Sequence, residues 1–395
     1  MKSSHLLLSA GIIACTCAAW LFLGSAISSR THISTGLMNQ EVSGVWGPAL
    51  TQNHPVAFYL TPNARNGKAT VLPSNSKIAV GLKSDPKRRG LLWHRTYEVD
   101  FSADYTFKNP TRVPQTLYLQ FDLPANSSGL HGFNFEIDGE ADTTTAMDNG
   151  RVTRAVVVPA EKEVTLHTAY HTRGTDSWNY HFQDARRITG FDLGMRTDFS
   201  DINFPVGTGS PDGRLENPTG WDLTWSYPDV LAAPSIGMDM PDVLNAGPIA
   251  QRIVKFAPVS LLFFVAVVVI IAILKRISIH PMHVFFVSAG FFAFHLLFAY
   301  LVDILNVYVS FGVATAISLI LVAGYLRAVG GSLLFKVAVP AQLIYLTLFS
   351  LSFFFDGLTG ITLAVVSVLT LGLLMVLTAK VEWRSVFGNK REIAT

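Results

Sequence analysis

Residues Ala257–Leu274 read APVSLLFFVAVVVIIAIL, an uninterrupted run of apolar side chains that carries no charge. A helix of about 20 apolar residues crosses the hydrocarbon core of a bilayer. Four further runs of similar length follow, interrupted only by Asp303, Asn306, Gln342 and short basic connections: Val284–Val302, Leu305–Leu326, Val337–Phe355 and Leu358–Ala379. A soluble domain of this size could not bury so much unbroken apolar sequence. Residues 255–379 are therefore predicted to form a bundle of five transmembrane helices.

The composition of the whole chain agrees with a membrane protein. Half of the 395 residues are hydrophobic and 15% are charged, whereas charged residues make up about 25% of an average soluble domain. The net charge of +2 gives no indication of a nucleic-acid partner. The partner that the composition predicts is the lipid bilayer.

The N-terminal apolar run, Leu6–Ile27, is open to three interpretations. A cleaved signal peptide has an apolar centre of about 7–15 residues, which is shorter than this run. Ile13-Ala14-Cys15 suggests a lipoprotein signal, but the sequence stays apolar after Cys15 instead of turning polar. We therefore expect an uncleaved anchor helix within residues 1–28. Cys15 and Cys17 both lie in this run, so the exported part has no cysteine for a disulfide.

Residues 29–254 have a different composition and predict a β-rich domain. From Tyr97 to Lys108, apolar and polar residues alternate strictly, which is typical of a half-buried strand. Shorter alternations recur at Leu117–Phe121, Phe133–Ile137, Val164–Tyr170, Phe191–Met195 and Trp221–Trp225. Short strands without a helical period between them predict an antiparallel sandwich or barrel, as one large or two small modules.

Turn residues divide these predicted strands. Asp138-Gly139 and Asn149-Gly150 are turn dipeptides, because their residues adopt positive φ at little cost. Asn109-Pro110 and Leu123-Pro124 should end strands, since proline has no N–H to donate. Lys87-Arg88-Arg89 is interpreted as a solvated loop.

The basic residues of the short loops predict the orientation. With six helices and the N-terminus inside, one set of loops faces the cytoplasm together with a tail of residues 380–395. These segments hold Lys275, Arg276, Arg327, Lys336, Lys380, Arg384, Lys390 and Arg391. The opposite loops carry Asp303 and Asp356 and no basic residue. The positive-inside rule therefore predicts that both termini are cytoplasmic and that the β-rich domain is extracytoplasmic.

Several local patterns give this sequence a resemblance to the CreD-like inner-membrane proteins associated with bacterial cell-envelope integrity. They are Gly47-Pro48 after the anchor, Trp221, Trp225, Pro228 and Pro241, Ile279-His280-Pro281-Met282, and Trp383 after the last helix. The resemblance is most specific from about Ile188 to Phe387, and the segment from about Arg95 to Phe182 departs from it. It implies a multi-pass bacterial inner-membrane protein with a periplasmic domain and a part in the response to envelope stress. It implies no reaction.

Ionisable side chains within the membrane are the first candidates for chemistry. His295 lies midway along the third predicted helix, about two turns from Asp303 near its outer end. A proton relay is one interpretation. The other is that Asp303 belongs to an external hairpin with Asn306, that Asp356 marks the matching turn, and that His295 bonds within the bundle.

Other histidines and an aromatic cluster are further candidates. His280 and His283 have a spacing that suits metal binding, but zinc needs three or four ligands, and Pro281 favours the first turn of a helix. His167 and His171 would share one strand face. Residues 178–182, Trp-Asn-Tyr-His-Phe, are either a sugar-stacking platform or core packing, and packing is the commoner use of such clusters.

The sequence contains no G-x-S-x-G, H-E-x-x-H or phosphate-binding loop motif. No catalytic, cofactor-binding or metal residue is assigned. The leading hypothesis is a non-enzymatic inner-membrane protein whose periplasmic β-domain binds or senses an envelope component, with an envelope or membrane-protein partner. The alternative is a transport or lipid-handling protein whose activity lies in the bundle, and a membrane-embedded hydrolase is the third. Few polar residues within the helices disfavour transport, because a hydrophilic path needs a polar lining.

Overall fold

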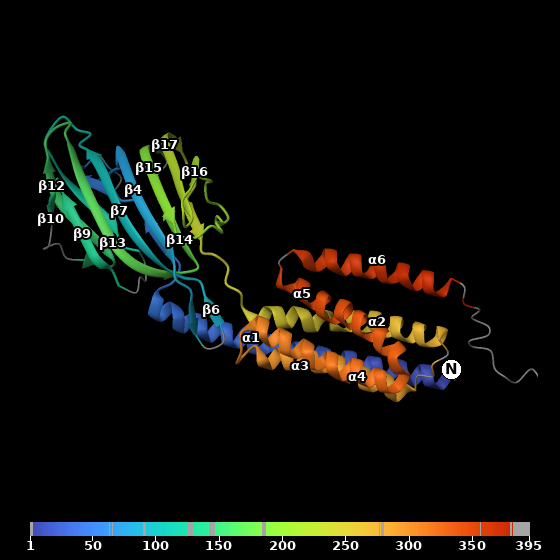
Figure 1. Cartoon of the computed structure of the whole chain (residues 1–395). Coiled ribbons are helices and arrows are strands. Elements are labelled where there is room, and N and C mark those ends of the chain that lie inside the picture. Colours follow the sequence, from blue (N-terminus) through green and yellow to red (C-terminus); the bar gives the residue numbers. More distant parts are fainter. Residues whose placement is uncertain are drawn as a thin grey trace, which may run out of the picture. The chain divides into compact units, whose positions relative to one another are not determined.

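The chain folds into a β-rich unit, Gly36–Leu244, and a helical unit that combines Met1–Thr35 with Asn245–Thr395 (Figure 1). The computed structural model describes residues 3–62, 64, 66–89, 92–124, 129–141, 147–183, 187–275, 277, 280–355, 357–379 and 381; for residues 3–6, 30–41 and 43 it describes the backbone alone. The prediction of a β-rich domain between an N-terminal helix and C-terminal helices is confirmed.

The described part of the β-rich unit holds four sheets. The strands are β1 (Leu50–Asn53), β2 (Val56–Leu60), β3 (Lys68–Val71), β4 (Asn75–Ser84), β5 (Lys87–Arg89), β6 (Leu92–His94), β7 (Thr96–Lys108), β8 (Gln115–Asp122), β9 (His131–Ile137), β10 (Glu140–Ala141), β11 (Met147–Asp148), β12 (Arg151–Val158), β13 (Glu163–Thr175), β14 (Ser177–His181), β15 (Arg187–Thr197), β16 (Gly213–Glu216), β17 (Trp221–Leu231) and β18 (Ile236–Asp239). The largest sheet has the order β10-β9-β13-β7-β4-β15-β17-β16, and a second has the order β11-β12-β8-β2-β3. Two smaller sheets are β1-β14-β18 and β5-β6.

The alternating pattern predicted the main strands correctly. In β7 the apolar positions from Tyr97 to Phe107 are buried, and the polar positions between them are more exposed. β8, β9, β13, β15 and β17 coincide with the other predicted strands. Phe133 is an exception within its strand, because it is exposed while Phe135 is buried.

Two predicted turns are confirmed and one predicted loop is wrong. Asp138 and Gly139 both have positive φ and join β9 to β10, and Asn149 and Gly150 join β11 to β12 in the same way. Lys87–Arg89, expected to be a loop, forms the strand β5 and pairs with β6. Arg88 and Arg89 are exposed in this short ribbon, so its charged sequence does not distinguish it from a loop.

The two larger sheets share one hydrophobic core. Phe101 of β7 lies 6.4 Å from Phe121 of β8, measured between ring centroids. Leu117, Leu119 and Phe121 of β8 are fully buried, as are most inward-facing residues of β7 and β13. The core lies wholly within the β-rich unit.

The first helix is longer than predicted. α1 extends from Ser3 to Trp46, and its apolar part, Leu7–Ser29, is long enough to cross a membrane. A helix of this length measures about 66 Å, roughly twice the hydrocarbon thickness. Its last residue, Trp46, contacts two basic side chains. The centroid of its ring lies 5.3 Å from Lys87 Nζ and 4.9 Å from Arg173 Cζ.

The described part of the chain contains five helical segments that are long and apolar enough to span a membrane, not six. They are Leu7–Ser29, Ala246–Leu274 (α2), Pro281–Leu301 (α3), Val307–Phe354 and Leu358–Thr378 (α6). The fourth joins α4 (Val307–Gln342), a π-helical turn (Leu343–Leu348), α5 (Phe349–Leu351) and a 3-10 turn (Ser352–Phe354). The predicted fourth and fifth helices merge in it because no loop separates them.

The merged segment nevertheless reverses its direction. Gly330 and Gly331 have non-helical backbone angles, and Gly331 has φ +64°. Gln342 Nε2 donates to Ser318 Oγ at 3.0 Å, although 24 residues separate them. In one straight helix these residues would lie about 36 Å apart. The two halves therefore run antiparallel, and the glycine pair lies midway between the two bonded residues in sequence. Figure 1 shows that the chain turns back within this segment.

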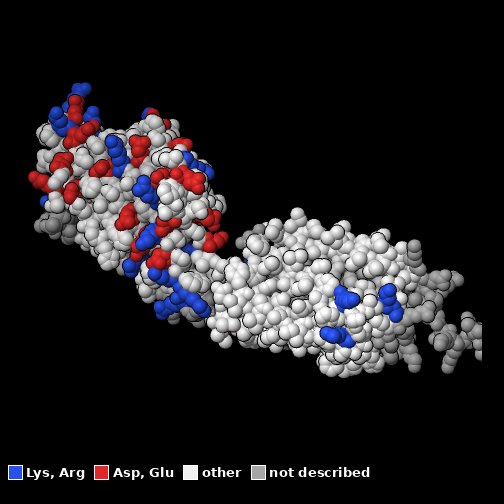
Figure 2. Space-filling model, viewed as in Figure 1, with Lys and Arg blue, Asp and Glu red and all other residues white. Residues whose placement is uncertain are grey.

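Charge is distributed unevenly between the units. Charged side chains cover the visible face of the β-rich unit, whereas the visible face of the helical unit shows only a few basic residues near one end (Figure 2). Several residues used to predict orientation, turns and family resemblance lie outside the described residues: Arg276, Ile279, Asp356, Lys380, Trp383, Arg384, Lys390 and Arg391.

Candidate functional site

Five neighbouring strands each place a small residue at the same level on the exposed face of the largest sheet. The backbone register pairs these residues in order across the sheet: Ala169 of β13, Ser102 of β7, Ala79 of β4, Gly194 of β15 and Thr224 of β17. We call this set the small-residue row. Because neighbouring strands lie about 4.8 Å apart, the row is about 19 Å long.

Polar and charged rows flank the small-residue row on both sides. The Asp100 row consists of His171, Asp100, Gly81, Arg196 and Asp222, and the Asp104 row consists of His167, Asp104, Lys77, Asp192 and Ser226. Each lies two residues from the small-residue row along its strands. The flanking rows are thus about 13 Å apart, given a rise of about 3.3 Å per residue.

A hollow of about 660 Å³ lies over the small-residue row and the Asp100 row. His131 and Gly132 of β9 line it at one end, and Arg196 and Asp222 line it at the other. The backbone hydrogen bonds of the central strands hold its floor. We call this hollow the trough. A preformed depression with polar groups at its margins is a usual form of a binding site.

His167 and His171, predicted to share a strand face, do so on β13. Each pairs across the sheet with a carboxylate of β7. His171 Nδ1 lies 2.7 Å from Asp100 Oδ1, and His167 Nδ1 lies 2.7 Å from Asp104 Oδ1. These pairs are directly opposite in the antiparallel register, so the backbone fixes their positions. Each imidazole is bound to a carboxylate at the margin of the small-residue row.

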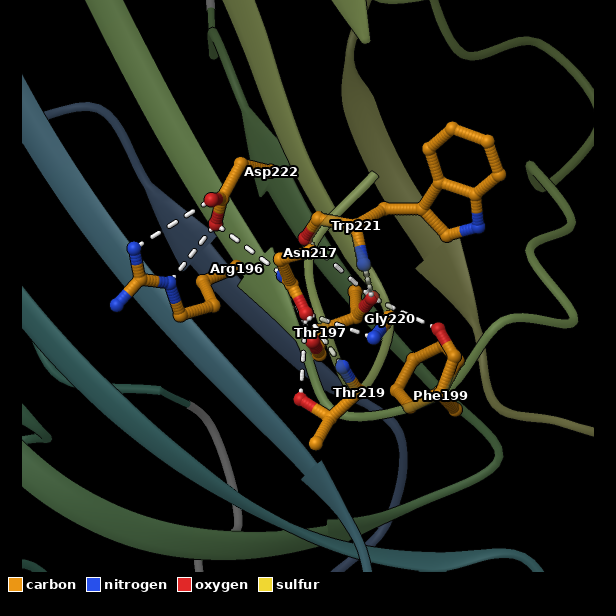
Figure 3. A network of polar contacts seen from close by, with 8 residues as sticks. All are labelled: Arg196, Thr197, Phe199, Asn217, Thr219, Gly220, Trp221 and Asp222. Atoms are coloured by element: carbon orange, nitrogen blue, oxygen red, sulfur yellow. Dashed lines mark hydrogen bonds and ion pairs between the residues drawn. The ribbon is translucent and has the colours of Figure 1, made fainter. Parts of the chain in front are cut away.

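The Arg196–Asp222 pair forms the far end of the trough (Figure 3). Arg196 Nε donates to Asp222 Oδ1 at 2.8 Å, and a second, longer hydrogen bond joins the guanidinium to Oδ2. The guanidinium holds the pKa of the Asp222 carboxyl below its usual value. Both residues lie at neighbouring positions of β15 and β17, so the pair depends on the register between these strands.

A compact loop at Asn217–Gly220 fixes that register. Asn217 Oδ1 accepts hydrogen bonds from the backbone N–H groups of Thr219 and Gly220, at 3.0 and 2.7 Å. A Cβ at Gly220 would lie 2.5 Å from the Thr197 carbonyl oxygen, so only glycine fits. Thr197 Oγ1 in turn accepts from the Trp221 N–H at 3.0 Å. Figure 3 shows how these contacts join the start of β17 to the end of β15.

The aromatic residues of β14 and its neighbour Phe182 are core residues, not a sugar-stacking platform. Trp178 and Tyr180 are fully buried and Phe182 is nearly so. Their rings pack against one another and, for Tyr180 and Phe182, against Phe191. The packing interpretation is therefore confirmed.

The core also contains a polar group that the sequence analysis missed. His54 is 4% exposed, and its Nδ1 lies 2.8 Å from the Tyr180 hydroxyl. That hydroxyl lies 3.0 Å from the hydroxyl of Tyr105. Burial lowers the pKa of His54 to about 3 and raises the pKa of Tyr180. His54 lies between β1 and β2, where no alternating pattern indicates burial.

His295 packs against Trp20 of α1. Asp303 lies in a turn, as predicted. The His295 ring is fully buried, its Nδ1 lies 2.9 Å from the Phe291 carbonyl oxygen, and its centroid is 5.2 Å from that of Trp20. Asp303 lies eight residues further on, about 12 Å along a helix axis, in the turn before Asn306, which caps α4. The interpretation that His295 bonds within the bundle is confirmed.

His280 and His283 act at the start of α3. His280 caps the helix, accepting from the Met282 N–H at 3.3 Å, and Pro281 occupies the first turn as predicted. His283 Nδ1 lies 2.8 Å from the Tyr325 hydroxyl. Within the described ranges, no group of three or more His, Cys, Asp or Glu residues is placed to hold a metal.

The bundle is more polar inside than its sequence suggested. Buried side chains with hydroxyl or amide groups are Ser260, Ser288, Ser310, Ser318, Gln342, Ser350 and Thr370. Ser318 Oγ donates to the Gly290 carbonyl oxygen at 2.8 Å, and the Tyr345 and Thr370 hydroxyls lie 2.8 Å apart. A single hydroxyl within an apolar run lowers its mean hydropathy only slightly, so the sequence does not reveal these groups. In the folded chain they lie together between the helices.

The family comparison matches the last part of the chain. Residues 220–384 match the family of the inner membrane protein CreD. The resemblance to this family, expected from the sequence, is thereby confirmed over a segment that begins later than the predicted Ile188. The CreD match begins at Gly220 and includes β17, the exit from the β-rich unit, and the helices from α2 to α6. Most of the trough lies upstream of it.

Similarity to other proteins is distant. No curated protein matches the chain. A Legionella pneumophila protein described as nutrient binding is 10% identical over 68% of this chain and 99% of its own, with a TM-score of 0.36. An M1 zinc metallopeptidase from Deinococcus radiodurans is 9% identical over 69% and 93% of the two chains, with a TM-score of 0.29. Likenesses at these scores carry no conclusion about fold or function.

Proposed function

We propose that the chain crosses the bacterial inner membrane six times, with both termini in the cytoplasm and the β-rich unit in the periplasm. The reversal at Gly330-Gly331 supports two crossings within Val307–Phe354, because 48 helical residues are more than twice the length that one crossing needs. The basic loop residues support the orientation. The two larger sheets, which share one core, support a sandwich-like periplasmic domain.

The proposed function is non-enzymatic maintenance of the cell envelope through recognition of an envelope component at the trough. The alignment of five small residues between two charged rows is the observation that carries this proposal. Each small residue belongs to a different strand, so a side chain larger than threonine at any of the five positions would interrupt the floor. The CreD match supports the inner-membrane location.

Filling the floor of the trough tests this function. Ala79→Tyr places a large ring on the central strand β4, at an exposed position where a β-sheet tolerates aromatic residues. We expect this variant to fail to complement a strain that lacks the gene under detergent or cell-wall antibiotic stress. The matched control is Val157→Tyr, at a 70% exposed position of the other large sheet, which should complement fully. Equal protein levels are checked by immunoblotting, and full complementation by Ala79→Tyr would refute the proposal.

The buried polar side chains of the bundle favour a second candidate, a transport or lipid-handling activity. In that case His295→Ala or Gln342→Leu should abolish complementation although the protein remains abundant. If the bundle serves mainly as an anchor, His295→Ala should complement, and deletion of residues 47–244, which keeps α1, should not. This pair of outcomes separates the two functions.

A further inference from the structure

We infer that the trough binds an extended cationic chain, such as a basic peptide segment. This inference rests on the proposed function of the trough and adds the chemical class of its ligand. It follows from the dimensions of the floor, from the charges of the two flanking rows, and from the way in which these charges are already hydrogen-bonded.

The dimensions of the trough suit a linear ligand that lies across the strands. The small-residue row is about 19 Å long, which equals about six residues of an extended chain at 3.3 Å each. The hollow lies over the small-residue row and the Asp100 row, and the Asp104 row lies about 7 Å from the floor on its other side, within reach of the side chains of a bound chain. Because the floor consists of the small residues Ala, Ser, Gly and Thr, a ligand backbone can lie close to the sheet.

The flanking rows and the adjoining strand β9 carry an excess of negative charge. Five carboxylates, Asp100, Asp104, Asp192, Asp222 and Glu136, and two cations, Lys77 and Arg196, occupy these positions. Asp100, Asp222 and Arg196 line the hollow itself, and the other four lie beside it. Arg196 is paired with Asp222. Lys77 has Asp104 and Asp192 as its neighbours on the two adjacent strands, so it also offers little to an anionic ligand.

The other four carboxylates, Asp100, Asp104, Asp192 and Glu136, are hydrogen-bonded to serine, asparagine or histidine side chains, which do not cancel a negative charge unless the histidine is protonated. Ser226 Oγ donates to Asp192 at 2.7 Å, and Asn134 Nδ2 donates to Glu136 at 2.6 Å. Asp100 and Asp104 are paired with imidazoles, and their side chains are 78% and 56% exposed. When histidine is neutral, these four carboxylates are oriented, and Lys77, which lies between Asp104 and Asp192, offsets one of their four charges. Ammonium or guanidinium groups on a ligand would complete their coordination.

Fluorescence anisotropy with short charged peptides tests the inference on the full-length protein in nanodiscs of zwitterionic phosphatidylcholine. The probes are labelled hexalysine, hexaglutamate and a neutral serine-glycine hexamer. We expect hexalysine to bind and the other two probes not to bind. Hexalysine binding should weaken as the salt concentration rises toward about 0.1 M, because the Debye length falls to about 10 Å.

Asp100→Asn with Asp104→Asn removes two charges and keeps the side-chain shapes. The variant can no longer form two exposed ion pairs with the lysines of the probe, so hexalysine should bind about tenfold more weakly. The matched control, Asp148→Asn with Asp201→Asn, removes two exposed carboxylates of the same unit outside the three rows and should bind like the unsubstituted protein. Circular dichroism confirms that both variants are folded.

The outcomes separate the ligand class from the function of the trough. Absence of hexalysine binding, or equal binding by the Asp100→Asn, Asp104→Asn variant, would overturn the inference. The neutral or the anionic probe could instead bind to the unsubstituted protein and fail to bind to Ala79→Tyr. That result would overturn the inferred ligand class and leave the proposed function intact. Full complementation by Ala79→Tyr would instead reject the function itself.

Discussion

His54 is the residue of the β-rich unit whose burial has the clearest consequence for stability. Its imidazole is enclosed with the hydroxyls of Tyr180 and Tyr105 and must be neutral in the folded protein. Its pKa is about 3 when folded, against 6.5 in the unfolded chain. Because the folded pKa is depressed, its full contribution is present above pH 6.5 and is lost as pH falls toward 3.

We therefore predict acid sensitivity that depends on His54. Between pH 7 and pH 5 the unfolded state gains a proton that the folded state does not bind, which should reduce the free energy of unfolding by about 2 kcal/mol. The variant His54→Gln keeps a hydrogen-bond acceptor for Tyr180 and should lose this part of the pH dependence. Urea unfolding, followed by tryptophan fluorescence at both pH values, measures it.

His181→Gln is the control for this experiment. His181 is exposed and lies 2.7 Å from the Ser235 hydroxyl, so its removal should leave the pH dependence of unfolding unchanged. An unaltered pH dependence in His54→Gln would show that this histidine is not the source of the acid sensitivity.

The helical hairpin around Gly330-Gly331 is the element whose sequence is hardest to interpret. The chain reverses within two residues, one of which has a positive φ that a residue with a Cβ adopts only with strain. Ser318 and Gln342 lie twelve residues on either side of Gly330 and meet face to face. The hydrogen bond between them satisfies an N–H group of the Gln342 amide that would otherwise face hydrocarbon.

Cross-linking should show this hairpin directly. In a background with Cys15 and Cys17 replaced by alanine, Ser318→Cys with Gln342→Cys should react completely with a short bifunctional thiol reagent in native membranes. The control pair, Ile320→Cys with Ile344→Cys, has the same spacing in sequence, but both side chains are exposed on the surface of the helical unit. Cross-linking of the control pair alone would contradict the hairpin.

The β-rich unit should be stable without the membrane. Its strands form a core of their own, and its boundaries at Gly36 and Leu244 adjoin the helical unit. We predict that residues 36–244, expressed alone, fold as a soluble monomer. The measurements are size-exclusion chromatography and far-ultraviolet circular dichroism. A spectrum dominated by helix, or aggregation without a cooperative unfolding transition, would contradict this prediction.

The topology of the entire chain follows from the number of crossings. With six crossings, a reporter fused after Asp303 should be periplasmic, and reporters fused after Arg327 and after Thr395 should be cytoplasmic. With five, the segment after Gly331 would not return, and the C-terminal reporter would be periplasmic. Paired alkaline phosphatase and green fluorescent protein fusions distinguish the two arrangements.

Periodicity in the sequence determined the local structure of this protein. Strict alternation placed β7 and its buried face, Asp138-Gly139 and Asn149-Gly150 placed two hairpins, and apolar runs placed the membrane helices. These features follow from neighbouring residues, because burial of one face of a strand or helix repeats with a fixed period. The pattern was insufficient where a charged ribbon resembles a loop, as at Lys87–Arg89.

The trough and the buried polar groups arise only from pairing between distant segments. Ala79, Ser102, Ala169, Gly194 and Thr224 are unremarkable in sequence, and they become one floor because five strands align in a particular register. His54 becomes a neutral core residue because Tyr180 lies opposite it, and Ser318 meets Gln342 because the chain reverses between them. Register and chain reversal are set by long-range packing, which no local period encodes.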